Sequence, residues 1–477
     1  MLRRAARNVR INARRHPVRP VPRGLATPSS SKDDGATGTP PPWRQIAILS
    51  GSSFVANAGF GCIIPVLPSL SESLSLGAVG VGVILSAPAA ARVVLNVRLG
   101  ALADEIGRRP LMIAGSALGA AGTFATGSAG SLLELVPARL LAGAGSAATL
   151  AGAQAYMADV TEGRGDRGKL LGVQQAAVAL GFIGGPALGG GLAEVLGPHA
   201  LFHAVGVCNL LCVAGYALLP ETHQGTGIAA SDADAAADAD TRARLAAAWR
   251  GPLPPLLAMQ LAQYLGYACH LSVVPLRAVD VMAASPGDIG VLFSTVSAVA
   301  IVGAPLGGYL ADFGRRTAVV PAASLTVLGA AAVPLAADGA QFYAAMIAWG
   351  LGASLMTPAL AAISADVAPP KARGAVVSYS RVAQDSAFLC GPLAYGALAD
   401  ALSPSAAIFA SSACSAAALG FFAARAPETL PKKAAAPVLP DDDAPPARRD
   451  PSPAPPAAMA ATPPKAPAPM QDPPRDA

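Results

Sequence analysis

Gly100-Ala-Leu-Ala-Asp104-Glu-Ile-Gly107-Arg108-Arg109 lies between two long apolar stretches, the first beginning at Val79 and the second at Leu111. Further along the chain, Gly308-Tyr-Leu-Ala-Asp312-Phe-Gly314-Arg315-Arg316 again joins two apolar stretches. Apolar runs of this length are typical of helices that cross a membrane, and the repeated loop indicates two similar halves. The two loops therefore predict a membrane protein built by duplication.

The composition also favours a membrane environment. The chain of 477 residues is 53% hydrophobic and only 13% charged, with a mean hydropathy of +0.47. A soluble protein of this length carries far more surface charge. The formal net charge of +5 does not indicate nucleic-acid binding, because the basic residues lie at the N-terminus and in short loops between apolar segments.

The sequence contains no pattern that predicts a metal, a cofactor or a catalytic site. The six cysteines lie inside apolar runs, without the spacing of metal ligands or of a disulfide framework. There is no Gly-rich loop for nucleotide phosphates and no catalytic triad. We therefore expect no cofactor, no enzymatic activity and no energy supply from nucleotide hydrolysis.

Residues 1–42 form a basic segment before the first apolar run. Residues 1–32 hold eight arginines and one lysine, and the first acidic residue is Asp33. The absence of an apolar core argues against a secretory signal peptide, whereas arginines on one helix face are typical of an organelle presequence. This pattern favours the inner membrane of a mitochondrion over that of a plastid. The alternative is a cytosolic tail that holds anionic lipid.

Twelve apolar stretches of about twenty residues follow, each long enough to cross a hydrocarbon core of ~30 Å. They lie near residues 45–68, 79–102, 111–129, 132–157, 170–193, 200–219, 253–277, 288–311, 318–337, 340–365, 375–399 and 405–425. Residues 43–220 and 251–426 thus form two halves of six helices, joined by a flexible loop at 221–250. Residues 427–477 are rich in proline and alanine, and we expect them to be disordered.

Short motifs recur between the halves at a nearly constant offset of 206 to 208 positions. The paired segments are 143–145 with 350–352, 158–160 with 365–367, 185–186 with 391–392, and 220–222 with 427–429. Because each repeat has an even number of helices, both halves have the same orientation in the membrane.

The basic residues predict that orientation. Twelve Lys or Arg residues lie in loops after even-numbered spans, and Arg277 alone lies in a loop after an odd-numbered span. The positive-inside rule places both termini and the two charged loops on the cytoplasmic side, or on the matrix or stroma side of an organelle membrane.

Four motifs resemble those of the major facilitator superfamily, over about residues 43–426. They are residues 100–109, Arg139-Leu-Leu-Ala-Gly143-Ala-Gly145, Gly181-x-x-x-Gly185-Pro186-x-x-Gly189-Gly190 and Gly61-Cys-Ile-Ile-Pro65-Val-Leu-Pro68. The last two are similar to motifs of twelve-span drug:proton antiporters, including tetracycline and multidrug exporters. The resemblance implies an all-α integral membrane fold of twelve transmembrane helices in two parallel six-helix repeats.

The resemblance also implies a gate at the charged loop. The residues expected to act in gating are Gly100, Asp104, Gly107, Arg108, Arg109, Asp159, Gly185 and Pro186. Asp104 can accept hydrogen bonds from Arg108 or from the N-terminus of a neighbouring helix. The family implies that this contact joins the second and eleventh spans, with Asp159 completing a charge cluster. The alternative is that the arginines only fix the topology.

Two further features bear on the gate. The second copy of the loop is one residue shorter between Asp312 and Gly314, so we expect the gate contact in the first half alone. Pro186 removes one backbone hydrogen bond from the fifth span, which lets that helix kink and slide against a partner. The alternative is a kink that is merely tolerated.

Four charged residues fall inside predicted spans, where charge is costly and usually faces a cavity or a partner. The expected coupling residues are Arg92, Arg139, Arg381 and Asp385. We expect Asp385 to be shared between Arg92 and Arg381, either for coupling or as a structural ion pair. Arg139 matches a position that the family links to proton transfer, and it can tune a nearby carboxyl group or hold an anionic substrate.

In the family, spans one, four, seven and ten line the substrate path. The candidates at these positions are Asn57, Gln263, Tyr264 and Trp349, with helix–helix hydrogen bonding as the alternative role. The first span has no acidic residue, which departs from many drug:proton antiporters. The remaining protonatable candidates are Asp385, Glu134 and His270.

These features predict a monomeric secondary transporter that works in the lipid bilayer by alternating access. The leading function is export of a small organic solute in exchange for protons. The first alternative is a facilitator or symporter for a sugar or metabolite, and the second is a transport-inactive membrane sensor.

Overall fold

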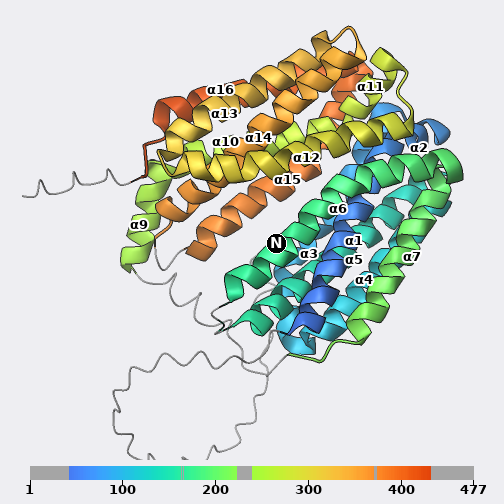
Figure 1. The fold of residues 1–477 in the computed structure, drawn as a ribbon, viewed down its shortest axis with the longest axis horizontal. Coiled ribbons are helices and arrows are strands. Elements are labelled where there is room, and N and C mark those ends of the chain that lie inside the picture. Colours follow the sequence, from blue (N-terminus) through green and yellow to red (C-terminus); the bar gives the residue numbers. More distant parts are fainter. Residues whose placement is uncertain (1–41, 163, 165, 223–238, 370–372, 431–477) are drawn as a thin grey trace, which may run out of the picture. The chain divides into compact units, whose positions relative to one another are not determined.

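The computed structural model describes residues 42–162, 164, 166–222, 239–369 and 373–430, and every regular element among them is a helix (Figure 1). The first half contains α1 (Trp43–Ile63), α2 (Leu67–Ser73), α3 (Gly77–Ile106), α4 (Arg108–Ser128), α5 (Leu132–Thr161), α6 (Arg167–Leu196) and α7 (Pro198–Ala217). The second contains α9 (Ala239–Arg250), α10 (Leu253–Ser272), α11 (Val274–Met282), α12 (Pro286–Ala311), α13 (Arg315–Ala332), α14 (Gly339–Val367), α15 (Arg373–Ala401) and α16 (Pro404–Arg425). Short 3₁₀ helices, η1 (Ile64–Val66) and η2 (Val333–Leu335), extend α1 and α13. The basic segment before residue 42 and the tail after residue 430 lie outside the described residues.

Each of the twelve predicted spans coincides with a long helix, which in three cases is followed by one or two short helical elements. Eight helical stretches in the described part are long and apolar enough to cross a membrane. They are α1 with α2, α3, α6, α7, α12, α13, α14 and α16. The other four predicted spans correspond to α4, α5, α10 and α15, and the total of twelve crossings stays a prediction.

The central segment is not a loop throughout. Residues Ala239–Arg250 form α9, because alanine, leucine and arginine in this stretch are all good helix formers. Ala248 is buried against the second half, and the Trp249 ring lies edge-on to Tyr379 on α15, with 5.3 Å between the ring centroids. This part of the predicted linker therefore packs against the second half.

The two halves are built alike. In the first half α4 packs on α5 and α1 on α6, and in the second half α13 packs on α14 and α10 on α15. A Cβ atom placed on Gly145 would collide with the backbone of Gly119, and one placed on Gly352 would collide with that of Thr326. The glycines that recur in the sequence thus mark two equivalent close helix crossings.

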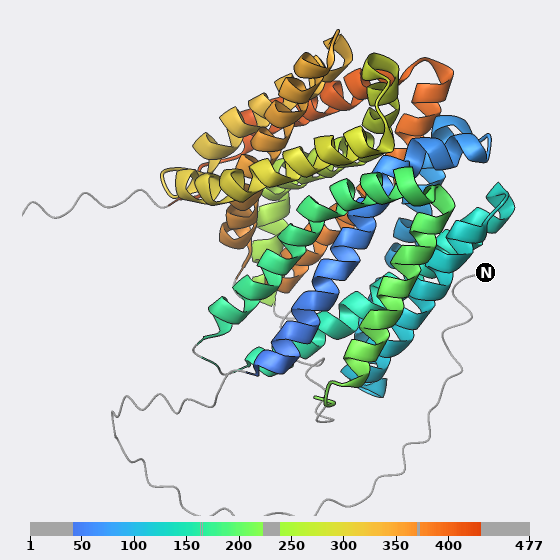
Figure 2. The same cartoon turned by 45° about the vertical axis from the view of Figure 1, so that its right-hand side comes forward.

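The halves meet through two helix pairs, α3 with α15 and α6 with α12 (Figures 1 and 2). The expected packing of the second span on the eleventh is therefore confirmed. We call the end that carries Arg108 and Arg315 the basic end and the opposite end the far end. Each half has its own hydrophobic core at the basic end, whereas one core at the far end combines residues of both halves, such as Leu67 and Val274.

Candidate functional site

The charged loop between α3 and α4 assembles the predicted charge cluster. Gly107 has a φ of +98°, in the region that favours glycine, and it turns the chain sharply into α4. Arg108 Nη2 lies 3.0 Å from Asp104 Oδ1, and Arg108 Nε lies 3.0 Å from Asp159 Oδ2. The Arg108 guanidinium thereby ties together the ends of α3, α4 and α5. The packing around Gly100 lies outside the described residues.

A partner of this loop that sequence reasoning missed is Glu221, just after α7. Its two carboxylate oxygens accept hydrogen bonds from the backbone N–H groups of Arg108 and Arg109, both at 3.0 Å, and so cap α4. Next to it, Thr222 Oγ1 donates to Asp159 Oδ2 at 2.8 Å. The signal in the sequence is the Pro-Glu-Thr triplet at 220–222 and 427–429, whose repetition does not reveal its partner.

The second half forms the same network despite its shorter loop, while the expectation that the gate contact occurs in the first half alone stays a prediction. Arg315 lies 3.2 Å from Asp312 and 3.3 Å from Asp366, and Glu428 accepts from the N–H groups of Arg315 and Arg316. The missing residue is absorbed because Gly314 is extended, with a φ of 169°, and Asp312 pairs with Arg315 three positions on rather than four. Glu428, assigned from the sequence to the tail, therefore belongs to the second half.

Asp104 is engaged within its own half in this structure. Its described ion-pair partner is Arg108, and the described residues show no ion pair between Asp104 and α15. The predicted gate contact between the second and eleventh spans thus stays a proposal for another conformation.

A second charged pair lies in the loop between α5 and α6. Arg164 Nε donates to Asp166 Oδ1 at 2.8 Å. This hydrogen bond lowers the pKa of the Asp166 carboxyl group and raises the pKa of the Arg164 guanidinium. Both groups therefore stay charged where the loop enters α6.

Gly185 and Pro186 lie where α6 has neighbours on two sides. A Cβ atom on Gly185 would lie 2.6 Å from the Ala58 carbonyl oxygen, so this glycine lets α6 approach α1 within the first half. On the other side, a Cβ atom on Gly290 of α12 would collide with the Pro186 carbonyl. The backbone N–H of Ala187 donates across the halves to Ser294 Oγ at 3.0 Å. The Gly-Pro motif therefore lies in the contact between the halves.

Of the four charged residues, Arg92 on α3, Arg139 on α5 and Asp385 on α15 interact electrostatically, but they do not form an ion-paired triad with Arg381. Asp385 Oδ2 accepts a hydrogen bond from Asn96 Nδ2 at 3.2 Å, across the two halves. Asp385 attracts Arg92 electrostatically, and neither Arg92 nor Arg381 makes an ion pair within the described part of the chain. The expected sharing of Asp385 between two arginines is therefore replaced by a hydrogen bond to an asparagine on the other half.

Arg139 is the most deeply buried charge, with 4% of its surface exposed. Its Nε donates to the Ile84 carbonyl of α3 at 2.9 Å, and its guanidinium lies near enough to Arg92 for the two to repel each other. Arg381 is exposed and lies near Tyr264 of α10. Arg92 thus lies near the Asp385 carboxylate and the Arg139 guanidinium, whereas Arg381 lies beside Tyr264.

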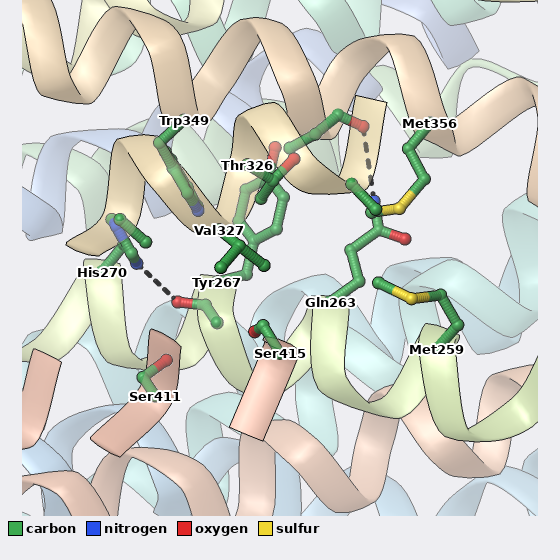
Figure 3. Close-up of a pocket in the computed structure, with 14 residues that line it drawn as sticks. Met259, Gln263, Tyr267, His270, Thr326, Val327, Trp349, Met356, Ser411 and Ser415 are labelled. Carbon is green, nitrogen blue, oxygen red and sulfur yellow. Dashed lines mark hydrogen bonds between the residues drawn. The ribbon is translucent and has the colours of Figure 1, made fainter. Parts of the chain in front are cut away.

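The predicted substrate residues do not share one cavity. Gln263 is buried in the second half, where its Nε2 donates to Thr357 Oγ1 at 2.8 Å, and Trp349 is buried at the other side of the same pocket, against His270 (Figure 3). In the first half, Asn57 donates to the Ser53 carbonyl of its own helix. For Gln263 the alternative role, hydrogen bonding between helices, fits the bond from α10 to Thr357 on α14, whereas Trp349 makes ring contacts with Tyr267 and His270.

The pocket drawn in Figure 3 lies inside the second half, between α10, α13, α14 and α16. His270 is fully buried there, stacked on Trp349 with 3.9 Å between the ring centroids, and its Nδ1 contacts the Gly266 carbonyl. The cavity volume is about 10 Å³, which is room for about one water and too little for an organic solute. The substrate role of Gln263 and Trp349, which line this pocket, therefore stays a prediction.

Comparison with known proteins also divides the chain into two similar halves. A model of the Major Facilitator Superfamily matches residues 49–259 and, a second time, residues 256–464. The chain belongs to the major facilitator superfamily. The expected fold class, an all-α membrane protein built from two repeats, is thereby confirmed, while the count of twelve spans stays a prediction.

Individual members of the superfamily are more distant. The chain is 35% identical over 190 residues to the class C tetracycline resistance protein of Escherichia coli, which covers 38% of this chain and 46% of that protein. It is 31% identical over 176 residues to multidrug resistance protein 1 of Bacillus subtilis (strain 168), with 37% and 45% covered. These alignments span less than half of each relative.

The fold itself is shared over a longer stretch. The crystal structure of a bacterial homologue of the human lysosomal transporter Spinster, inward-facing and unoccupied, covers 80% of this chain and 95% of its own. The two chains superimpose with a TM-score of 0.65 at 15% sequence identity. At this identity the likeness concerns the fold alone.

Proposed function

We propose that this superfamily member exports a small organic solute in exchange for protons, by alternating access between its two halves. The resistance proteins to which it is similar include tetracycline and multidrug resistance proteins. The motif around Gly185 and Pro186 supports antiport, since it lies in the contact between the halves.

One observation carries the alternating-access part of the proposal. The halves share a hydrophobic core at the far end, while at the basic end each has a separate core and a separate charge network. Such a molecule is closed at one end and can part at the other without breaking either half. The arrangement corresponds to the inward-facing state of a transporter whose basic end faces the cytoplasm or matrix.

Proton coupling is assigned to Asp385. It is the acidic residue near the middle of a span, and its hydrogen bond to Asn96 joins α15 to α3 across the halves. Protonation would remove its attraction for Arg92 and weaken this contact between the halves. Glu134 is a poorer candidate, because it is exposed and accepts from the Gly130 N–H near the start of its own helix.

The proposal is tested by reconstituting the purified full-length protein into liposomes with an imposed pH gradient. The solute panel contains tetracycline, a quinolone, a sugar and a carboxylic acid metabolite. Proton-coupled export predicts uptake of a drug-like solute that stops when an ionophore collapses the gradient. Uptake that continues after the collapse would instead favour the facilitator alternative, which the absence of an acidic residue from α1 supports.

The basic segment 1–42 leads us to place the protein in an organelle inner membrane. Fusing residues 1–42 to a fluorescent protein tests this placement. Import into mitochondria is expected, and a fusion that stays in the cytosol would remove the presequence proposal without touching the transport proposal.

A further inference from the structure

At the far end, the halves contact each other through two equivalent helix pairs, α6 with α12 and α3 with α15. A Cβ atom on Gly290 of α12 would collide with the carbonyl of Pro186 on α6, and a Cβ atom on Gly82 of α3 would lie 2.5 Å from the carbonyl oxygen of Pro392 on α15. These pairs repeat at the offset that relates the two halves, 208 positions for the glycines and 206 for the prolines. The interface therefore has approximate twofold symmetry within one chain.

Within this interface, a carboxylate from each half caps a helix of the other half. Asp400, near the end of α15, accepts from the backbone N–H groups of Ala78 at 2.8 Å and Val79 at 2.9 Å, at the start of α3. Glu194, near the end of α6, accepts from the N–H of Gly287 at 3.0 Å, at the start of α12. The first N–H groups of a helix have no partner in their own helix, and they attract negative charge.

The two carboxylates are equivalent positions of the duplication. Glu194 follows Pro186 by eight positions, and Asp400 follows Pro392 by eight. Each acid therefore lies about two helical turns beyond the proline that contacts the opposite half. The same segment of each half supplies both the close backbone contact and the charged cap.

The two caps differ in how much they are needed. The start of α12 has a capping box of its own, formed by Ser285 and Asp288, so Glu194 adds one hydrogen bond to a helix that is already capped. The start of α3 has no side-chain cap from its own half, and Asp400 supplies two hydrogen bonds. Asp400 is therefore the stronger of the two contacts.

We infer that Glu194 and Asp400 form an outer latch, which holds the halves together at the far end and must release before that end can open. This inference rests on the alternating-access part of the proposed function. It assigns to two surface acids a task that neither the charged loops nor the central charges perform. Both acids are exposed, so water can replace the lost hydrogen bonds when the latch opens.

Removing a cap carboxylate shifts the equilibrium toward the state that is open at the far end. The loss of one helix cap corresponds to roughly a 2- to 30-fold change in an equilibrium constant. We expect Asp400→Ala to lie near the top of this range and Glu194→Ala near the bottom. The double variant should show the product of the two effects, since the two caps contact different helices.

The test measures the distance between the halves at the far end. Spin labels are attached at Ser73→Cys and Ala283→Cys, both exposed there, in the full chain with its six native cysteines replaced and embedded in lipid nanodiscs. The fraction of molecules with the longer distance between the two labels should increase from Glu194→Ala to Asp400→Ala and be largest in the double variant. The matched control is Glu72→Ala, an exposed acid on α2 whose carboxylate makes no hydrogen bond among the described residues.

Two results would overturn the outer latch: distance distributions that do not change in any latch variant, or an equal change in Glu72→Ala. Asp400→Asn guards against misfolding, because it keeps the side-chain size and one acceptor oxygen and should give an intermediate shift. The distances are read without solute or pH gradient. The outer latch can therefore be tested even if the protein shows no proton-coupled transport in liposomes. A negative result in the distance measurement and a negative result in the transport assay can be distinguished.

Discussion

Asp385 is the residue on which proton coupling depends most in the proposed mechanism. We predict that Asp385→Asn keeps solute flux across liposomes but makes its rate insensitive to the pH gradient, because the amide cannot take up a proton. Asparagine retains an acceptor for Asn96, so the hydrogen bond between α15 and α3 can still form, although without the negative charge that attracts Arg92. The control is Glu134→Gln, which should leave the response to the gradient unchanged; a normal response in Asp385→Asn would move the proton site elsewhere.

Arg108 has a structural role that lysine cannot fill. Its guanidinium is 12% exposed and contacts Asp104, Asp159 and the Ala103 carbonyl at once, whereas a lysine ammonium cannot span these acceptors. We predict that Arg108→Lys lowers stability by about 1 to 3 kcal/mol, seen as a lower melting temperature in detergent.

The equivalent substitution in the second half should cost less. The side chain of Asp312, a partner of Arg315, is 76% exposed, against 40% for Asp104, and solvent screens such a pair. Arg315→Lys should therefore lower the melting temperature less than Arg108→Lys does. A larger effect in the second half would contradict this order.

For single residues, the sequence predicted that Asp104, Arg108 and Asp159 form a charge cluster, but it did not predict that Glu221 would join them. Asp104, Arg108 and Asp159 meet as expected because the first two lie within one turn of each other. Glu221 could not be foreseen, since its contact with Arg108 joins positions 113 residues apart. Gln263 and Trp349 were assigned to a substrate path from the family pattern, yet their side chains pack inside the second half.

At the scale of elements, two neighbouring glycines of α6 differ in how closely another helix packs against them. A Cβ atom on Gly190 would collide with the Pro286 carbonyl of α12, whereas a Cβ atom on its neighbour Gly191 meets nothing within 4 Å. We predict that Gly190→Ala forces the halves apart at the far end, while Gly191→Ala has no effect. The spin-label pair at positions 73 and 283 measures both.

The Gly191→Ala variant also controls for helix propensity, because both substitutions replace glycine by alanine in one helix. Equal label distances in the two variants would mean that the contact between α6 and α12 does not hold the far end closed.

The lengths of the apolar runs predicted that the chain forms helices. They did not predict where those helices break. The long apolar runs predicted helices, and the helices are there. The break between α10 and α11 at Val273 comes just before Pro275 in the first turn of α11, and α9 combines helix-forming residues with the burial of Ala248 against the second half. The constant repeat offset predicted the internal symmetry, which the paired charge networks at Arg108 and Arg315 display.

In the molecule as a whole, the two halves are packed together at the far end and are separate at the basic end. At the basic end each half closes on itself, and at the far end the halves share a core and exchange helix caps. In the alternating access that we propose, the halves separate at the far end and join at the basic end, where the family pattern implies a contact between Asp104 and α15. Sequence motifs identified the superfamily, but the conformation is a property of contacts between the halves that no single motif encodes.

The central claim is that solute and protons cross the membrane in opposite directions through this chain. It is tested most directly by loading proteoliposomes with a pH-sensitive dye and adding the transported solute on one side, with no gradient imposed. Exchange predicts that solute entry drives protons out and raises the internal pH, and that Asp385→Asn abolishes the change. Solute entry with no change in internal pH, or with acidification, would contradict it.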